Sequence, residues 1–192
     1  MFIRAFIISV MSGICAMNGT PTAHAAEWQI LPGASAIRIQ ATQFGQPFKG
    51  GFERFGGHVD FEPGELPTGN VRIEVDITSL KTGAADRDAL VQNKDWFDSG
   101  RFPKAVFVAQ HFRRLDAERY EADGTLSIKG VTTPVVLPFA LATRDNGTDM
   151  RGTVVLKRLV FGLGNGQLAD FGMVGPDVTV EINLHVTRVN DH

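Results

Sequence analysis

The chain has 192 residues, of which 43% are apolar and 21% charged, and its formal net charge is -2. This balance is typical of one globular domain, or at most two small ones, with enough apolar material for a core. The small net charge and the lack of a Lys/Arg run argue against a nucleic-acid-binding protein and against an electrostatic membrane anchor.

Residues 1–25 have the pattern of a secretory signal peptide. Arg4 is the only early charge, residues 5–17 are almost continuously apolar, and Ala23-His24-Ala25 fits the small-x-small cleavage pattern. We expect cleavage after Ala25, a single mature domain at residues 26–192, and a periplasmic or secreted location. A retained anchor is the alternative, although the apolar run is short for a membrane span. The only cysteine, Cys15, lies in the expected signal, so the mature chain has no disulfide and no thiol chemistry.

Most of the mature chain alternates apolar and polar residues, as half-buried β-strands do. Strands are predicted at residues 28–31, 35–42, 50–61, 71–78, 104–115, 120–128, 135–141, 150–157 and 178–187. Residues 44–48 are interpreted as a turn, and Gly56-Gly57 predicts a bulge within the long third strand. Residues 104–115 are apolar on both sides, so both faces of that strand are expected to be covered. Asp145-Asn146-Gly147 predicts a hairpin turn.

About eight or nine strands and one helical segment indicate an all-β protein. A two-sheet sandwich and an antiparallel barrel both fit this pattern. Long strands, glycines at bends and a last strand regular enough to pair with the first favour the barrel.

The segment from Ile77 to Phe107 interrupts the run of strands. It contains the turn pair Thr82-Gly83, a charged helical stretch at residues 84–93 and the adjacent aromatics Trp96-Phe97. This pattern is typical of a flap that covers one end or face of a sheet. Asp86 and Asp88 are two residues apart, and such positions do not face each other on a helix, so they do not indicate an acid/base pair.

The remaining motifs give no support to an enzyme or a metal protein. The histidines of the mature chain (His58, His111, His185 and His192) are isolated from one another, G-x-S-x-G is missing, and the glycines at 162–166 lack the Lys-Ser/Thr of a phosphate loop. The sequence is instead rich in aromatic residues, with 14 Phe and 2 Trp. An ordinary β core and an apolar ligand cavity both explain that excess.

Several motifs resemble one protein family in order and spacing. They are Gly51-Phe52-x-x-Phe55-x-Gly57, Ser79-Leu80-x-Thr82-Gly83-x-x-x-Arg87-Asp88, Trp96-Phe97-Asp98, Gly130-Val131-Thr132-x-Pro134 and Arg158-x-x-Phe161-Gly162. From Trp28 to Arg188 the chain resembles the YceI-like family of secreted polyisoprenoid-binding proteins. The resemblance implies an extended eight-stranded antiparallel lipocalin-like barrel with one short helical insertion and a tunnel for an isoprenoid or quinone. It also implies, for part of the family, an association with membrane b-type cytochromes. Many members carry histidine where this chain has Ala34 and Gln43, which puts the head-group preference in question.

We therefore predict a non-enzymatic binding protein that holds a polyisoprenoid or a quinone tail in its barrel, for carriage or storage. No metal, covalent cofactor or nucleic acid is expected, and a homodimer is left open. The residues predicted to line, support or close the interior are Ile37, Ile39, Phe52, Phe55, Ile73, Val75, Trp96, Phe97, Leu126, Phe139 and Leu184. Arg87, Asp88 and Arg158 are expected to fasten the flap and loops through charge-assisted hydrogen bonds. The alternatives are an accessory protein of a cytochrome/quinone electron-transfer system, a stress-related barrel packed solid, and an enzyme acting on a bound lipid.

Overall fold

A computed structural model describes residues 27–64, 66–144, 147–165 and 173–189. The expected signal peptide and the Asp145-Asn146 pair of the expected hairpin lie outside the described residues. The described strands are β1 (Glu27–Ile30), β2 (Ala36–Gln43), β3 (Gln46–Phe52), β4 (Phe55–Asp60), β5 (Asn70–Asp76), β6 (Leu80–Lys81), β7 (Lys104–Arg114), β8 (Arg119–Ile128), β9 (Val131–Arg144), β10 (Gly147–Lys157) and β11 (Asp177–Arg188). One α-helix, α1 (Ala85–Leu90), and four short 3-10 turns, η1 (Pro32–Ala34), η2 (Leu66–Thr68), η3 (Ile77–Ser79) and η4 (Arg158–Phe161), complete the described elements.

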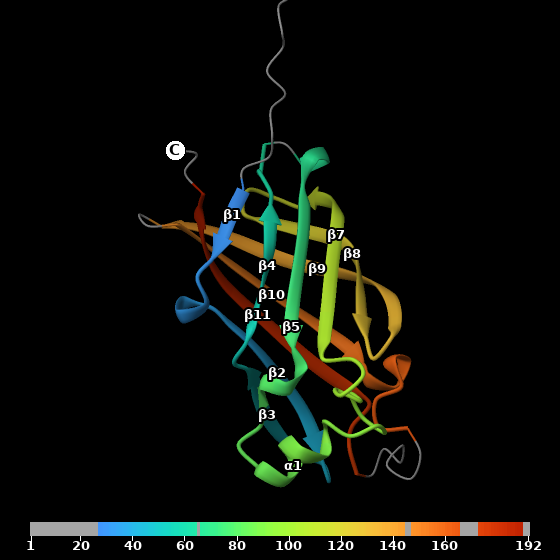
Figure 1. Cartoon of the computed structure of the whole chain (residues 1–192). Helices are drawn as coiled ribbons and strands as arrows, with labels where there is room; N and C mark the ends of the chain where they lie inside the picture. The colour runs from blue at the N-terminus through green and yellow to red at the C-terminus, as the bar shows by residue number, and fades with distance from the viewer. Residues whose placement is uncertain (1–26, 65, 145–146, 166–172, 190–192) are drawn as a thin grey trace, which may run out of the picture.

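The strands close into an antiparallel barrel (Figure 1). The order β1-β4-β5-β7-β8-β9-β10-β11 becomes a ring because β1 pairs with both β4 and β11, through pairs such as Trp28 with Val59 and Trp28 with Arg188. The other half of β11 pairs with β2, whose neighbours are β3 and then β6. β1 and β2 therefore act together as one long, interrupted strand, and β3 and β4 act as another. Both extend the barrel. The all-β, eight-stranded antiparallel barrel with one short helix is confirmed.

The predicted strand 50–61 is wrong in detail. The chain forms β3 and β4 instead, and the break falls at Glu53-Arg54, where the Arg54 amide donates to Ser79 Oγ at 3.0 Å. β3 also begins earlier than expected, at Gln46, so the turn is confined to Phe44-Gly45. Gly56 and Gly57 pair regularly with β5. Gly57 is required for close approach, because a Cβ there would lie 2.0 Å from the Arg72 carbonyl oxygen.

The expectation that both faces of β7 are covered is also corrected. The register of β7 against β8 shifts between Ala109 and His111, as a β-bulge does. Ala105 and Phe107 face the interior before the shift, and Phe112 and Arg114 face it afterwards. The mixed apolar pattern therefore reflects a change of inward face along the strand. The outward-facing Val106 is only half-buried.

The segment between β5 and β7, residues 77–103, is the predicted flap, and α1 lies at one end of the barrel (Figure 1). The start of β1 and the C-terminal end of β11 lie at the opposite end. The flap starts at η3, which Asp76 caps by accepting a hydrogen bond from the Thr78 amide at 2.8 Å. Gly83 then takes a positive φ of 77°, which favours glycine, just before the helix. No helix among the described residues is long and apolar enough to cross a bilayer.

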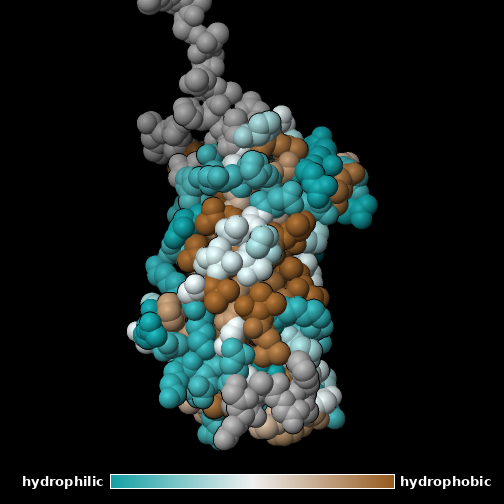
Figure 2. Space-filling view, turned by 90° about the vertical axis from the view of Figure 1, so that its right-hand side faces the viewer, coloured by the Kyte–Doolittle hydropathy of each residue, from teal (hydrophilic) through white to brown (hydrophobic). Residues whose placement is uncertain are grey.

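Apolar side chains reach the outer surface as well as the interior. On the barrel wall seen in Figure 2, hydrophobic and polar residues are intermixed. Val136 on β9 is 49% exposed, while its chain neighbour Leu137 faces inward and is 7% exposed. The buried face of each strand is therefore the one that faces the interior of the barrel.

Candidate ligand-binding cavity

Two cavities lie end to end inside the barrel. The larger, here called the mouth cavity, has a volume of about 690 Å³, and the smaller, here called the flap cavity, about 170 Å³. They share lining residues from several strands: Ile37, Val75, Ala105, Leu126, Leu156 and Val180. The two cavities therefore adjoin at these residues, here called the junction, and together they are here called the channel. Their combined extent is within the range of ligand pockets, whereas packed protein interiors leave few voids larger than a water molecule.

Most of the residues predicted to line the interior do lie on this channel. Ile37, Ile73, Val75, Leu126, Phe139 and Leu184 line the mouth cavity, and Ile39, Phe52, Trp96 and Phe97 line the flap cavity. Phe55 lines neither described cavity. It sits at the start of β4 opposite Val75 and packs against the main core. Contact of these residues with a ligand remains a prediction.

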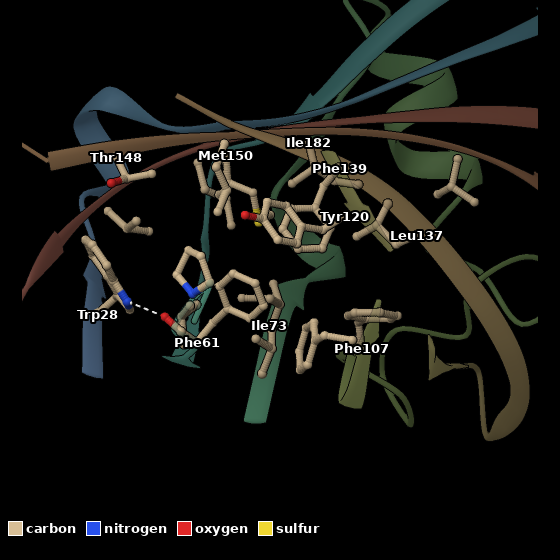
Figure 3. A pocket seen from close by; sticks show the side chains of 18 of the residues that line it. Trp28, Phe61, Ile73, Phe107, Tyr120, Leu137, Phe139, Thr148, Met150 and Ile182 are labelled. Carbon is tan, nitrogen blue, oxygen red and sulfur yellow. Dashed lines mark hydrogen bonds between the residues drawn. The ribbon is translucent and has the colours of Figure 1, made fainter. Parts of the chain in front are cut away.

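Aromatic rings cluster inside the mouth cavity (Figure 3), and of these only Phe139 is among the predicted site residues. The ring centroid of Phe61 lies 4.9 Å from Phe112, 5.6 Å from Tyr120 and 5.6 Å from Phe139. Phe112 escaped prediction because the β7 bulge turns it inward. The sequence predicts a strand at Tyr120 but does not assign this residue to the site. Its position as the only tyrosine, in a segment that alternates apolar and polar residues, could have indicated a side chain that faces the cavity.

Gly124 makes room for another aromatic side chain in the same cavity. It faces the interior from β8, opposite Ala109 of β7. A Cβ at this position would lie 2.9 Å from the Phe107 ring and 2.4 Å from the Val108 carbonyl oxygen. Because Gly124 has no side chain, the ring of Phe107 can pack directly against the backbone of β8.

Polar groups at the mouth, the end away from α1, are largely paired with protein. Trp28 Nε1 donates to the Phe61 carbonyl oxygen at 2.8 Å (Figure 3), and Arg188 Nη2 donates to Glu62 Oε2 at 2.7 Å. Arg114 Nη2 donates to the Tyr120 hydroxyl oxygen at 2.9 Å. These contacts hold the rim of the barrel together.

At the opposite end, Arg158 fastens two loop segments. Its side chain is 2% exposed, and its guanidinium donates to the carbonyl oxygens of Leu163 at 2.7 Å, Val174 at 2.9 Å and Gly175 at 3.0 Å. A longer bond reaches Gly164, whose own amide donates to the Asp95 carbonyl oxygen in the flap at 2.8 Å. Burial lowers the pKa of Arg158, but an arginine remains protonated at neutral pH. The loop after η4 is thereby tied to the flap.

Asp88 fastens the flap to itself. Its Oδ1 accepts hydrogen bonds from the amide of Thr82 at 2.8 Å and from the hydroxyl of Thr82 at 2.6 Å. These bonds, the hydroxyl first, hold the pKa of the Asp88 carboxyl below its ordinary value, while burial opposes them. The contact closes the turn that leads into α1.

Arg87 does not make the fastening hydrogen bonds expected of it. Its Nε and Nη1 are buried, and neither has a hydrogen-bond partner in the part of the chain that the structure describes. The guanidinium carbon instead lies 4.1 Å from the ring centroid of Phe48. Arg87 and Phe48 both line the flap cavity. The predicted role of Arg87 is therefore corrected from a hydrogen-bonded loop fastener to a cation that packs on the Phe48 ring.

Asp88→Asn is expected to lower the free energy of unfolding by about 1 kcal/mol at neutral pH, because a charged acceptor is replaced by a neutral one. The folded-state pKa is depressed, so the contribution of the carboxylate is complete above its unfolded pKa of about 4 and is lost as the pH falls toward the folded value. Urea unfolding of both proteins at neutral and acidic pH checks this. Asp86→Asn, which changes an exposed carboxylate of the same helix, is the control. Equal stability of Asp88→Asn and the parent at neutral pH would contradict the assignment.

Among the described residues, no group of three His, Cys, Asp or Glu side chains could hold a metal ion.

A model of the YceI-like domain matches residues 28–186. The chain belongs to the YceI-like family. Of the two positions noted in the family comparison, Ala34 is exposed in η1 and Gln43 lines the flap cavity.

Named relatives of this YceI-like chain match it over most of its length. A UPF0312 protein of Vibrio vulnificus is 29% identical over 189 residues, covering 94% of this chain and 96% of the relative. The crystal structure of BcnA from Burkholderia cenocepacia is 27% identical, with a TM-score of 0.78, covering 82% of this chain and 99% of that one. A polyisoprenoid-binding domain from Saccharophagus degradans has a TM-score of 0.69 over 87% of this chain and 100% of its own. At 13% identity, that last likeness shows the fold alone.

Proposed function

We propose that this protein binds a long apolar ligand of the isoprenoid type, a polyisoprenoid or the tail of a quinone, inside its barrel. The observation that carries the proposal is the channel formed by the two cavities. The mouth cavity alone, at about 690 Å³, has roughly twenty times the ~30 Å³ of one liquid water molecule. A volume of this size argues against a barrel packed solid.

The chemistry of the walls supports an apolar chain as the occupant. Side chains such as Ile37, Leu126 and Val180 line the junction, and aromatic rings line the mouth cavity. Each buried CH2 contributes about 0.8 kcal/mol, so a long chain binds here with few polar contacts. The Saccharophagus degradans domain with the same fold is described as binding polyisoprenoid, which supports this ligand class.

The protein serves on this proposal as a carrier or store rather than as an enzyme. Trp96 and Phe97 line the flap cavity, and on this proposal they close the end away from the mouth. Secretion to the periplasm, with cleavage after Ala25, places the carrier outside the cytoplasm. Delivery of a quinone to a membrane b-type cytochrome is the partner role implied by the family resemblance.

Native mass spectrometry of the protein purified from its own host tests this proposal. The expected spectrum shows a mature chain beginning at Ala26 with the added mass of a long-chain lipid, and that lipid appears in the organic extract. The same spectrum gives the oligomeric state and so tests the homodimer. A clean ligand-free mass, with no lipid extracted and none taken up when polyprenyl lipids are added, would refute the binding function.

A further inference from the structure

The wall of the barrel has a seam between β9 and β10. The last regular pair between these strands is Phe139 with Gly152, but both strands continue beyond it. Within the described residues, 131–138 of β9 pair only with β8, and 153–157 of β10 pair only with β11. Figure 1 shows the two strands diverging from the end at which they pair. The seam is defined here as these two unpaired edges, residues 131–138 and 153–157.

The sequence of β9 explains why the pairing stops there. The Leu141 amide donates to the Glu118 carbonyl oxygen at 2.9 Å, on the side of β8. Amide directions alternate along a strand, so the N–H groups of positions 138 and 134 would point toward β10. Both positions are proline, which has no N–H and is confined within sheets largely to edges. Pro138 and Pro134 therefore prevent the ladder from continuing along the seam.

The side chains on both sides of the seam are apolar. Those that line the mouth cavity are Val135 and Leu137 of β9 and Val154 and Leu156 of β10. On the outer face, Val136 of β9 is 49% exposed and Val155 of β10 is 55% exposed. Figure 2 views the barrel from the side of the β8–β9 hairpin, and hydrophobic residues reach the surface there. An isoprenoid chain that crossed the wall at the seam would meet apolar side chains from the surface to the cavity.

The far end of the seam is closed by a side-chain contact. Lys129 lies in the turn between β8 and β9, and its Nζ donates to the carbonyl oxygen of Gly162, just after η4, at 3.0 Å. The same turn meets the flap, because a Cβ on Gly130 would lie 3.0 Å from the Phe102 ring. These contacts can break without the loss of any strand pairing described above. The β8–β9 turn can therefore move while the rest of the barrel stays closed.

The mouth is held together more firmly than the seam. Trp28 and Arg188 bind the Phe61 carbonyl oxygen and Glu62 across the rim, and the Phe61 ring lies 5.6 Å from the Tyr120 ring inside it. Passage through the mouth would disturb these hydrogen bonds and ring contacts. Passage through the seam would disturb apolar contacts and the one side-chain hydrogen bond at the β8–β9 turn.

We propose that the seam is a lateral entrance, through which an isoprenoid chain passes into the channel when the β8–β9 turn moves away from the loop after η4. This inference rests on the proposed binding function and adds the route by which the ligand is exchanged. A change that affects only this route alters the rates of uptake and release together and leaves the affinity unchanged.

Lys129→Met removes the hydrogen bond at the turn and is expected to speed both uptake and release of all-trans-retinol, a fluorescent isoprenoid alcohol, by about tenfold. The affinity is expected to stay the same. Stopped-flow energy transfer from tryptophan to retinol measures both rates. Lys104→Met is the matched control, because Lys104 binds Glu74 at 2.6 Å where β5 and β7 are fully paired. It is expected to leave both rates unchanged.

A cross-link over the seam tests the opposite change. Val136→Cys with Val155→Cys places thiols at two exposed positions that would be opposite each other if the pairing continued. Cys15, the only cysteine of the chain, lies in the expected signal peptide, so a bifunctional maleimide joins these two sites alone. The cross-link is expected to slow exchange by at least about tenfold. Val108→Cys with Thr125→Cys, cross-linked between the paired strands β7 and β8, is expected to leave exchange unchanged.

Equal exchange rates in the parent, in Lys129→Met and in the cross-linked protein would overturn the lateral entrance. So would faster exchange in Arg188→Met, which loosens the mouth, than in Lys129→Met. Thermal unfolding shows whether each variant is folded, and the cross-linked protein carries the test if Lys129→Met is not. Titration of the parent with geranylgeranyl phosphate separates the two proposals. A parent that binds this lipid retains the binding function even if the entrance is overturned, and a parent that binds neither ligand loses both.

Discussion

Arg158→Met is expected to lower the free energy of unfolding by about 3–5 kcal/mol, the largest effect on stability that we predict for a single side chain, because each buried carbonyl left without a donor costs about 1–3 kcal/mol. Arg158 is 2% exposed and donates to the carbonyl oxygens of Leu163, Val174 and Gly175. Methionine fills a similar volume but has no donor, so these carbonyl groups lose their partner in a place that water does not reach freely. Chemical denaturation followed by the fluorescence of Trp28 and Trp96 measures the effect.

Two further variants decide whether the loss comes from the hydrogen bonds. Arg151→Met removes an exposed arginine of β10, whose side chain is 65% exposed, and is expected to change stability by less than about 1 kcal/mol. Arg158→Lys keeps the charge but is expected to recover little stability, because one ammonium group cannot reproduce the planar fork of a guanidinium. If Arg158→Met unfolds at the same denaturant concentration as Arg151→Met, Arg158 does not hold the loop.

Ala105→Phe is expected to weaken binding of a long isoprenoid chain by roughly a hundredfold. Ala105 faces the interior from β7, is 8% exposed and lines both cavities, so a benzyl side chain there blocks their junction. Excluding the part of the ligand that occupies the flap cavity, with apolar contact equivalent to about four CH2 groups at about 0.8 kcal/mol each, gives a loss of roughly 3 kcal/mol, or about two orders of magnitude in affinity. Titration of the protein with geranylgeranyl phosphate measures this loss.

Val106→Phe is the control for the blocked junction, because Val106 is the next residue of β7 and points to the outer face. It is expected to leave the affinity unchanged. A short probe that occupies only the mouth cavity is expected to bind Ala105→Phe and the parent protein alike. If the long chain binds Ala105→Phe as tightly as it binds the parent, the two cavities do not act as one channel.

The alternation of apolar and polar residues predicted the strands and most of the side chains that face the interior, whereas the choice of a barrel over a sandwich rested on strand length, glycines at bends and the family resemblance. Ile73 and Val75 on β5 and Leu184 on β11 lie in the channel because successive side chains of a strand point to opposite faces. The regular last strand pairs with the first, as its pattern suggested, and this pairing closes the ring. The interruption after Ile77 is likewise visible in the sequence, because turn and helix signals there replace the period of two.

The prediction failed where the local pattern depends on a strand's neighbour. Phe112 faces inward only because the register against β8 shifts near Ala109, and periodicity along a single strand does not reveal such a shift. The break at Glu53-Arg54 depends in the same way on Ser79, which binds the Arg54 amide from a distant part of the chain. Phe55 pairs with Val75 and packs against the main core, but it lines neither described cavity.

The sequence by itself thus determined an all-β barrel with an apolar interior and a flap near Trp96, since strand periodicity and turn chemistry are local properties of the chain. The tertiary structure alone decided the roles of the charged residues near the flap. Arg87, Asp88 and Arg158 read alike as loop fasteners, yet Asp88 and Arg158 have partners while Arg87 Nε and Nη1 have none among the described residues. Thr82 lies six residues from Asp88, and the carbonyl partners of Arg158 lie 5 to 17 residues from it. Which charge is satisfied therefore depends on how these irregular segments fold back on themselves, and irregular segments have no periodic pattern from which to predict it.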